Sequence, residues 1–575
     1  MNSPESQPSA DTARAAVERA GAAPRSGGQI LIDCLVTHGV DTVFCVPGES
    51  YLAALDALYD VRDRIRLIVA RQDGGAAYMA EGYGKASGRP GICFVTRGPG
   101  ATNASIGVHT ARQDSTPMIL FVGQVGSDFV EREAFQEVDY RRMYGSMVKW
   151  AASIDRADRI PEFVSHAFHA ATSGRPGPVV LALPEDMLAA RAVAAPGGRY
   201  QVVQASPAPA DLGRIVQMLQ SAQRPVALLG GSVWSPEACA DFQDFAERAD
   251  LPVACAFRHQ DLFDNRHPNY VGDVGIGINP RLAARIRESD LLLVVGARLD
   301  EMTTQGYQLI APPVSRQPMI HVHAGAEELG RVYQAQLLVN AGVQPFAAAL
   351  RDLAVDGSRW REWLRGARAD YDAWQVPQAI PGALQMPEVV LWLREHLPPG
   401  TLLCNGAGNF AGFLGRYYRY SGWRTQVAPV NGSMGYGTPA AIGAQCAYPD
   451  RLVVSFNGDG DFLMNGQEIA TALQYGLPII YVVINNGMYG TIRMHQEREY
   501  PGRVYGTALS NPDFAALARA YGALGFTVEK TGQFAAAFQE ARAARRTALI
   551  ECRIDPQAIT TSTTLDAIRR KALGG

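Results

Sequence analysis

Two short polar motifs near the carboxyl end of the chain have the residue types of a metal and phosphate site. The first is Gly458-Asp459-Gly460, and Asn485-Asn486 follows after 24 intervening residues. Mg²⁺ takes oxygen ligands and usually keeps bonds to phosphate and water, so a few protein oxygens suffice to hold it. We expect the Asp459 carboxylate and the Asn486 amide oxygen to be two of them. The glycines beside Asp459 allow the backbone to approach a phosphate closely.

The residues between and before these motifs predict the elements that position them. Residues 452–456 form a short apolar run typical of a buried strand, residues 465–475 have helical composition up to Gly476, and residues 478–484 predict a second strand. In a right-handed parallel unit both motifs lie at one edge of the sheet, where ligands of open α/β sheets bind. Each motif alone is equally compatible with an ordinary turn or strand end, and their spacing in one unit favours a binding site.

This pattern resembles that of thiamine diphosphate (ThDP) enzymes, and residues 28–555 are similar to the catalytic subunits of acetolactate synthases. The order of several further motifs along the chain strengthens the resemblance. These motifs are Arg97–Asn103, Gly123–Val125, Ala134–Glu137, Ser173–Pro178, Met434–Gly437 and Pro439–Ala444.

The resemblance implies that ThDP and Mg²⁺ are the cofactors and assigns a role to several residues. The metal ligands would be Asp459, Asn486 and the main-chain carbonyl of Met488. The bulky side chain beneath the bent cofactor would be Met434, although a lone Met before Gly is also common in an ordinary core. Gln136 matches a residue expected at the substrate. The remaining residues expected at the diphosphate are Gly408, Asn409, Gly460 and Asp461.

Asp73 departs from the family pattern. ThDP enzymes of this type carry a catalytic Glu after an apolar strand, whereas this chain reads Arg71-Gln72-Asp73-Gly74-Gly75-Ala76. The resemblance therefore implies that Asp73 hydrogen-bonds the pyrimidine ring of the cofactor with a side chain one methylene shorter. The alternative is that Asp73 only caps the following helix, a favoured use of Asp.

Other departures concern the substrate and flavin. His495 falls near the Trp with which acetolactate synthases select 2-oxobutyrate, and it could equally belong to a polar surface loop. Residues 296–300 and Arg175 resemble flavin contacts, but residues 257–278 lack the usual Met-Gly pattern, so FAD is left open and is not favoured.

The domain layout predicted from strand and helix patterns is α/β, with three doubly wound parallel-sheet domains. The family arrangement places the cofactor between the N-terminal domain of one subunit and the C-terminal domain of another, which implies a homodimer or homotetramer. The ranges are a disordered tail (1–27), a pyrimidine-binding domain (28–198), a central domain (211–353), a connector (354–381), a diphosphate-binding domain (382–555) and a second tail (556–575).

Composition agrees with a cytoplasmic enzyme. The chain has 575 residues, 47% of them hydrophobic, and a net charge of -3, so there is no electrostatic reason to expect nucleic acid or membrane partners. It contains eight cysteines without a CxxC pair, which favours reduced core residues. The first 27 residues lack the apolar segment of a secretory signal, and no run of 18 apolar residues predicts a membrane span.

The predicted activity is ThDP- and Mg²⁺-dependent decarboxylation of a pyruvate-like 2-oxo acid with carboligation, as in acetolactate synthases of branched-chain amino acid biosynthesis. One alternative is a decarboxylase or carbon-carbon lyase acting on another 2-oxo acid or a 2-hydroxyacyl substrate. Another is a weakly active cofactor-binding paralogue, which only Asp73 suggests.

Overall fold

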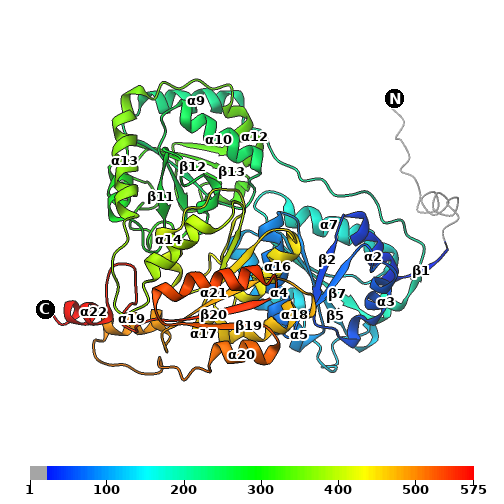
Figure 1. The fold of residues 1–575 in the computed structure, drawn as a ribbon. Helices are drawn as coiled ribbons and strands as arrows, with labels where there is room; N and C mark the ends of the chain where they lie inside the picture. The colour runs from blue at the N-terminus through cyan, green and yellow to red at the C-terminus, as the bar shows by residue number, and fades with distance from the viewer. Residues whose placement is uncertain (1–22, 575) are drawn as a thin grey trace, which may run out of the picture.

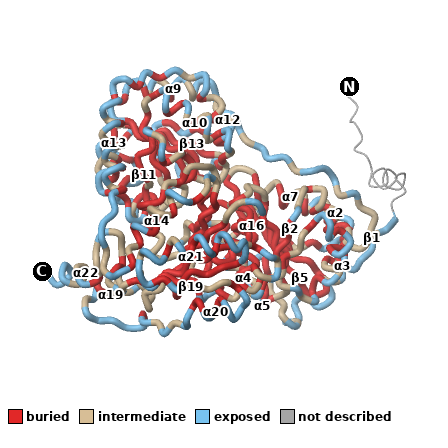
Figure 2. Tube along the Cα trace, viewed as in Figure 1, coloured by how far each residue is buried: buried red, intermediate tan, exposed pale blue. Residues whose placement is uncertain are grey.

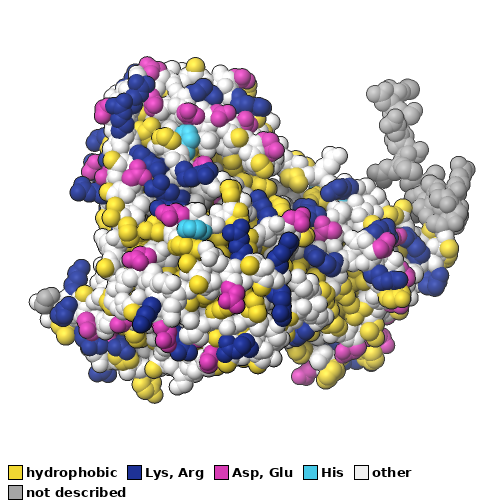
Figure 3. All heavy atoms as spheres, viewed as in Figure 1, with side chains coloured by type: hydrophobic (Ala, Val, Ile, Leu, Met, Phe, Trp, Pro, Cys, Tyr) yellow, Lys and Arg dark blue, Asp and Glu magenta, His cyan; other side chains and the backbone are white. Residues whose placement is uncertain are grey.

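A computed structural model describes residues 23–574, which form three α/β units, each built on one six-stranded parallel sheet (Figure 1). The prediction of three doubly wound parallel sheets is confirmed. Residues 1–22 of the expected N-terminal tail lie outside the described residues. On the face drawn in Figure 3, side chains of both charges are interspersed, in keeping with the small net charge.

The N-terminal unit has the strand order β3-β2-β4-β5-β7-β6. All seven residues of its central strand β5 are buried, because helices cover both faces of a parallel sheet. The strands are β2 (Thr42–Cys45), β3 (Arg66–Val69), β4 (Gly91–Val95), β5 (Met118–Gln124), β6 (Trp150–Ser153) and β7 (Pro178–Pro184). The helices are α2 (Gly27–Thr37), α3 (Leu52–Asp60), α4 (Asp73–Ser87), α5 (Gly98–Asp114), α6 (Tyr140–Tyr144), α7 (Ile160–Thr172) and α8 (Glu185–Ala189).

Residues 25–27, expected to belong to the tail, are structured. Strand β1 (Arg25–Ser26) pairs antiparallel with β8 (Arg191–Ala192), and α2 starts at Gly27. Ser26 and Gln29 form a capping box, in which each side chain accepts a hydrogen bond from the backbone N–H of the other. This reciprocal cap fixes the start of α2.

The central unit has the order β11-β10-β9-β12-β13-β14. Helix α13 comes from the segment expected to be a surface connector, but it buries Leu364, Ala367 and Tyr371. The ring of Tyr371 packs edge-to-face against Tyr270, so the helix belongs to the core of this unit. The strands are β9 (Pro225–Leu229), β10 (Val253–Ala256), β11 (Tyr270–Val274), β12 (Leu291–Val295), β13 (Met319–His323) and β14 (Leu337–Asn340). The helices are α9 (Pro209–Ser221), α10 (Pro236–Arg248), α11 (Pro280–Glu288), α12 (Val343–Leu350) and α13 (Arg361–Trp374).

The C-terminal unit has the order β16-β15-β17-β18-β20-β19. The strands are β15 (Leu402–Asn405), β16 (Gln426–Val427), β17 (Val453–Gly458), β18 (Ile480–Asn485), β19 (Leu524–Val528) and β20 (Ala548–Arg553). The helices are α14 (Met386–His396), α15 (Ala411–Tyr417), α16 (Gly437–Ala447), α17 (Asp459–Asn465), the 3₁₀ helix η7 (Gly466–Glu468), α18 (Ile469–Gln474), α19 (Gly490–Glu499), α20 (Phe514–Tyr521), α21 (Thr531–Ala543) and α22 (Leu565–Ala572).

Two sequence expectations for this unit need correction. The helix expected over 465–475 begins earlier, at Asp459, and is interrupted at η7, because Asp459 itself follows the strand directly and opens the helix. The segment 556–575, expected to be a tail, contains α22, which buries Leu565 and packs against α19. Figure 1 shows this helix at the C-terminal end, beside α19.

The N-terminal and C-terminal units of the same chain pack through α4 and α16. A side chain at Gly443 would come within 2.0 Å of the Met79 carbonyl oxygen, and one at Gly82 within 2.7 Å of the Ala440 carbonyl oxygen, so glycines let the two helices approach closely. One continuous hydrophobic core spans both units, seen as buried chain in the middle of Figure 2. The two sheets are therefore held as one rigid frame.

Candidate active site

The topological switch point of the C-terminal sheet lies between β15 and β17. The chain leaves β15 to one side and later returns on the other side as β17, so the loops after these two strands diverge, which is where open α/β sheets bind ligands. Residues 406–409 follow β15, and Asp459 follows β17. Strand β18 lies parallel beside β17, so Asn485-Asn486 ends at the same edge, as the sequence predicts.

Asp459 is held in one orientation by its neighbours. Its Oδ1 accepts a hydrogen bond from Gly460 N at 2.9 Å, and its Oδ2 accepts from Gly487 N and Asn511 Nδ2, both at 2.8 Å. The residue is 3% exposed, and burial raises the pKa of its carboxyl despite these donors. A buried carboxylate of this kind is stabilised by a bound cation.

The two other expected metal ligands lie on the loop that follows β18. Asn486 Oδ1 accepts a hydrogen bond only from Met488 N, at 3.2 Å, and the Met488 carbonyl accepts none from the described residues. Carboxylate, amide and carbonyl oxygens form the hard donor set that suits Mg²⁺. Within residues 23–574 no group of three or more His, Cys, Asp or Glu could hold a metal, so a cation here needs phosphate and water to complete its shell.

Asp461 ties together two segments near this switch point. Its Oδ1 accepts hydrogen bonds from Gly435 N at 2.8 Å and Ala407 N at 3.2 Å, while its buried Oδ2 has no partner among the described residues. Burial raises the pKa of this carboxyl to about 7. Gly435 has a φ of +78°, which only glycine adopts readily, and this turn presents the partly buried Met434.

Asn409 connects the loop after β15 to helix α19. Its backbone N–H donates to Thr491 Oγ1 at 3.1 Å, and its side chain contacts Thr491 Oγ1 and the Met494 sulfur. Gly408 precedes it, and a side chain there would collide with Phe410 at 2.7 Å. These contacts place the loop 406–409 directly against α19, the helix that follows the loop 485–488.

Asp73 lies at the carboxyl edge of the N-terminal sheet, at the first residue of α4. The helix is capped by Gln72, whose Oε1 accepts from Gly75 N at 2.9 Å, so the capping alternative does not explain Asp73. Its Oδ2 accepts a weak bond from Asn103 Nδ2 at 3.3 Å, and its buried Oδ1 has no partner among the described residues. Burial raises the pKa of this carboxyl. A buried acceptor without a protein partner suits a group that binds a ligand.

Gln136 lies in the same neighbourhood as Asp73. It has a φ of +65°, and its carbonyl accepts from Gly98 N at 2.9 Å, at the first residue of α5. A side chain at Gly100, in the first turn of α5, would lie 3.0 Å from Asp73 Oδ1. The buried Oε1 of Gln136 also lacks a partner among the described residues. Two unpaired polar atoms therefore lie at one edge of this sheet.

His495 is part of helix α19 and not of a surface loop. Its Nδ1 contacts Arg498 Nη2 at 2.6 Å, and burial, with the charge of Arg498, lowers the pKa of the imidazole.

The arginines that resemble flavin contacts are engaged within the protein. Arg175 donates to Ser115 Oγ at 2.9 Å, to Glu328 Oε1 at 2.7 Å and to the Arg112 carbonyl. Arg298 donates to the Gln113 carbonyl at 2.9 Å. These groups form an internal polar network, and FAD binding stays an open prediction.

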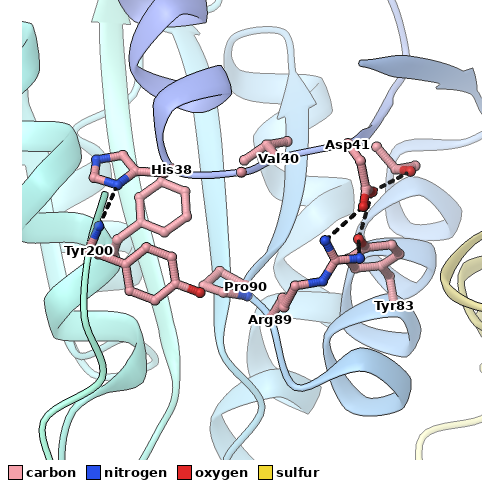
Figure 4. Close-up of a pocket in the computed structure, with 10 residues that line it drawn as sticks. His38, Val40, Asp41, Tyr83, Arg89, Pro90 and Tyr200 are labelled. Carbon is pink, nitrogen blue, oxygen red and sulfur yellow. Dashed lines mark hydrogen bonds and ion pairs between the residues drawn. The ribbon is translucent and has the colours of Figure 1, made fainter. Parts of the chain in front are cut away.

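The hollow in Figure 4 is separate from these residues. It lies at the amino-terminal ends of β2 and β4, beside His38, and Asp41 there pairs with Arg89 and accepts from Tyr83. Asp73 lies at the opposite edge of the same sheet. The cavity measures about 10 Å³, room for about one water molecule.

Sequence reasoning missed Asn511, which contacts the expected metal ligand directly. It lies 25 residues beyond Asn486 in an irregular segment, and only its position before Pro512 sets it apart in the sequence. No local spacing could have linked it to Asp459.

Comparison with known families accounts for the three units in order. The N-terminal TPP binding domain of thiamine pyrophosphate enzymes matches residues 25–143, their central domain matches 212–350, and their C-terminal TPP binding domain matches 406–552. The chain belongs to the thiamine pyrophosphate enzyme family. Thiamine pyrophosphate is another name for ThDP, so this finding confirms the family and the ThDP-binding domains predicted from sequence.

Among relatives in this thiamine pyrophosphate enzyme family, acetolactate synthase large subunits are prominent. The protein of Corynebacterium glutamicum is 31% identical over 538 residues, covering 90% of this chain and 84% of the relative. The protein of Parasynechococcus marenigrum is 33% identical over 523 residues, covering 88% and 83%. The isozyme 2 large subunit of Escherichia coli is 31% identical over 515 residues, covering 89% and 92%.

No helix within residues 23–574 is long and apolar enough to cross a membrane.

Proposed function

We propose that this protein uses ThDP and Mg²⁺ to decarboxylate a pyruvate-like 2-oxo acid and to transfer the remaining acyl unit to an acceptor carbonyl, as acetolactate synthases do. The observation that carries the proposal is the unpaired, buried Oδ1 of Asp73 at the carboxyl edge of the N-terminal sheet. The names of the relatives support the same reaction class.

When bound, ThDP supplies a nucleophilic carbon and an electron sink for decarboxylation. Asp459, Asn486 and the Met488 carbonyl would hold Mg²⁺ and, through it, the diphosphate. The loop 406–409 and Gly460 would line the diphosphate, with Asp461 fixing that loop. Met434 would contact the cofactor.

Asp73 would accept or donate a hydrogen bond at the pyrimidine ring through Oδ1. Its raised pKa places its proton closer to neutral pH than that of an exposed Asp, which suits a group that shares a proton with a ring nitrogen. Gln136 would offer its free amide oxygen to the substrate.

The test is a screen of the purified protein with ThDP, Mg²⁺ and a series of 2-oxo acids, measuring CO₂ release and the carboligation product separately. Release of CO₂ together with acetolactate from pyruvate supports the proposal. Asp73→Ala serves as the matched inactive control, since it should lower turnover by roughly 10² to 10⁴.

A second candidate is decarboxylation or carbon-carbon cleavage of a different 2-oxo acid or 2-hydroxyacyl substrate. The observation that favours it is His495 on α19, which by sequence resemblance falls near the place where acetolactate synthases carry a substrate-selecting Trp. CO₂ release from another 2-oxo acid without a carboligation product would support this candidate over the first. No turnover of any substrate by a protein that binds ThDP would support a weakly active paralogue.

A further inference from the structure

Four polar side chains form a continuous hydrogen-bonded chain across the C-terminal sheet, which we call the polar chain. It starts at Glu551 on β20, whose Oε1 accepts from Asn485 Nδ2 at 2.7 Å. Asn485 Oδ1 on β18 then accepts from Asn511 Nδ2 at 2.9 Å. The same Asn511 amide donates to Asp459 Oδ2 at 2.8 Å. The polar chain thus ends on the carboxylate expected to bind the metal.

The chemistry of the groups fixes the direction of every bond in the polar chain. Glu551 is 0% exposed and forms an ion pair with Arg553 at 3.1 Å. Its carboxylate oxygens are therefore acceptors, so the NH₂ group of Asn485 must face them. The oxygen of Asn485 must then face Asn511. Asn511 Nδ2 lies between two acceptor oxygens, and turning its amide over would set oxygen against oxygen at both contacts.

The backbone before Asn511 is hydrogen-bonded to the loop after β18, which carries the expected ligands Asn486 and Met488. Tyr489 N donates to the Thr507 carbonyl and Leu509 N to the Gly487 carbonyl, both at 2.9 Å, and Met488 lies opposite Ala508 in an antiparallel bridge. The segment 507–511 therefore holds the loop that presents Asn486 and the Met488 carbonyl. Asn511, the last residue of this segment, donates to Asp459, the third expected metal ligand.

We propose that Asn511 is a positioning residue that sets the orientation of the Asp459 carboxylate for Mg²⁺, with Asn485 and Glu551 fixing Asn511 in turn. This inference rests on the proposed function, since it requires that Asp459 binds the metal. In this proposal Asn511 acts through Asp459, to which it donates a hydrogen bond, and not as a ligand of the metal. Partners of this kind in metalloproteins typically change metal affinity by about 10- to 100-fold when removed.

The experiment measures metal binding and not turnover. Calorimetric titration of Mg²⁺ in the presence of ThDP is compared for wild type, Asn511→Ala and the control Asn340→Ala. Asn340 is a matched amide, because it also donates to two acceptors, the His323 and Ala324 carbonyls, but lies in the central unit. We expect Asn511→Ala to bind Mg²⁺ roughly 10- to 100-fold more weakly, and Asn340→Ala to match wild type.

A second pair of variants tests the far end of the polar chain. Glu551→Gln keeps an oxygen that can accept from Asn485 and should bind Mg²⁺ nearly as wild type does, whereas Glu551→Ala removes the acceptor and should weaken binding. This pair decides the question if Asn511→Ala fails to fold. Unchanged Mg²⁺ affinity in Asn511→Ala, or equal affinities for the two Glu551 variants, overturns the inference alone. A wild-type protein that binds no Mg²⁺ with ThDP overturns the proposed function as well.

Discussion

Asp73 carries a desolvation cost that its position in a helix does not remove. The N-terminus of α4 favours a negative charge, an effect of about 0.3 to 1 kcal/mol. Burial nevertheless raises the pKa of the carboxyl, so desolvation outweighs the helix dipole and the single bond from Asn103. A buried carboxyl with a raised pKa is typical of an active site.

The first prediction concerns the stability of ThDP-free Asp73→Asn. Because the pKa of Asp73 is raised in the folded state, its neutral form contributes stability below the unfolded value of about 4, and this contribution is lost as pH rises through the folded pKa. Asn remains neutral, so the variant should have a higher Tm than wild type at pH 7. The difference should narrow towards pH 4.5. A variant less stable than wild type at pH 7 contradicts the cost assigned to Asp73.

The second prediction is that Asp459→Ala abolishes Mg²⁺-dependent ThDP binding. Without the charged ligand, one amide and one carbonyl oxygen are too weak to hold the cation. Calorimetry with ThDP, with and without Mg²⁺, measures the effect, and Asp356→Ala at an exposed position of the chain is the control. Magnesium-dependent affinity equal to wild type would remove Asp459 from the metal site.

At the level of elements, helix α22 is tied by an ion pair to α19, the helix that follows the loop 485–488. Arg569 Nε and Nη2 donate to the two carboxylate oxygens of Glu497 on α19. Glu497 is 0% exposed and also accepts from Arg493 and Gly502 N. Hydrogen bonding, foremost from Arg569, lowers the pKa of Glu497 to about 2.

The third prediction follows from this ion pair. Arg569→Ala should release α22 and loosen α19, which hydrogen–deuterium exchange would show as roughly tenfold faster exchange over residues 490–499 and 565–572, equivalent to about 1.4 kcal/mol. Arg570→Ala is the matched control, because Arg570 is exposed on the same helix and forms no ion pair with the described residues. Equal exchange in the two variants would show that α22 docks without Arg569.

The sequence could predict elements whose residues repeat a local pattern. Strands β17 and β18 are apolar runs of ordinary length, and turn motifs follow both, so their parallel pairing and shared edge could be inferred. Helix α22 was not inferred, because only Leu565 of its eight residues is buried and its docking depends on the distant Glu497. Asn511 could not be found either, since its contact with Asp459 exists only in three dimensions.

At the level of the whole molecule, the two groups of expected cofactor residues belong to different units of the chain. Within residues 23–574 no hydrogen bond or ion pair joins Asp73 to the loop 485–488. Large aromatic side chains near each group are exposed, including Phe135 at 73% beside Gln136 and Tyr505 at 90% beyond α19. We propose that a second copy of the chain covers these exposed side chains.

The fourth prediction is that the protein is at least a homodimer at micromolar concentration, with each site built from two chains. Light scattering should give at least twice the chain mass of 62.0 kDa. An equal mixture of Asp73→Ala and Asp459→Ala chains, each inactive alone, should regain about a quarter of wild-type activity, because half of the dimers are mixed and each has one intact site. An active monomer, or no recovery on mixing, would place the whole site in one chain.

The polar chain from Glu551 to Asp459 also has an evolutionary consequence. Its donors and acceptors alternate. A substitution that turns a donor into an acceptor, or the reverse, therefore sets two acceptors or two donors against each other at the next contact. Replacement of Asn511 by a residue without a donor is then tolerated only together with a change at Asn485 or Glu551. In an alignment of close relatives, positions 485, 511 and 551 are therefore expected to covary, while Asp459 stays constant.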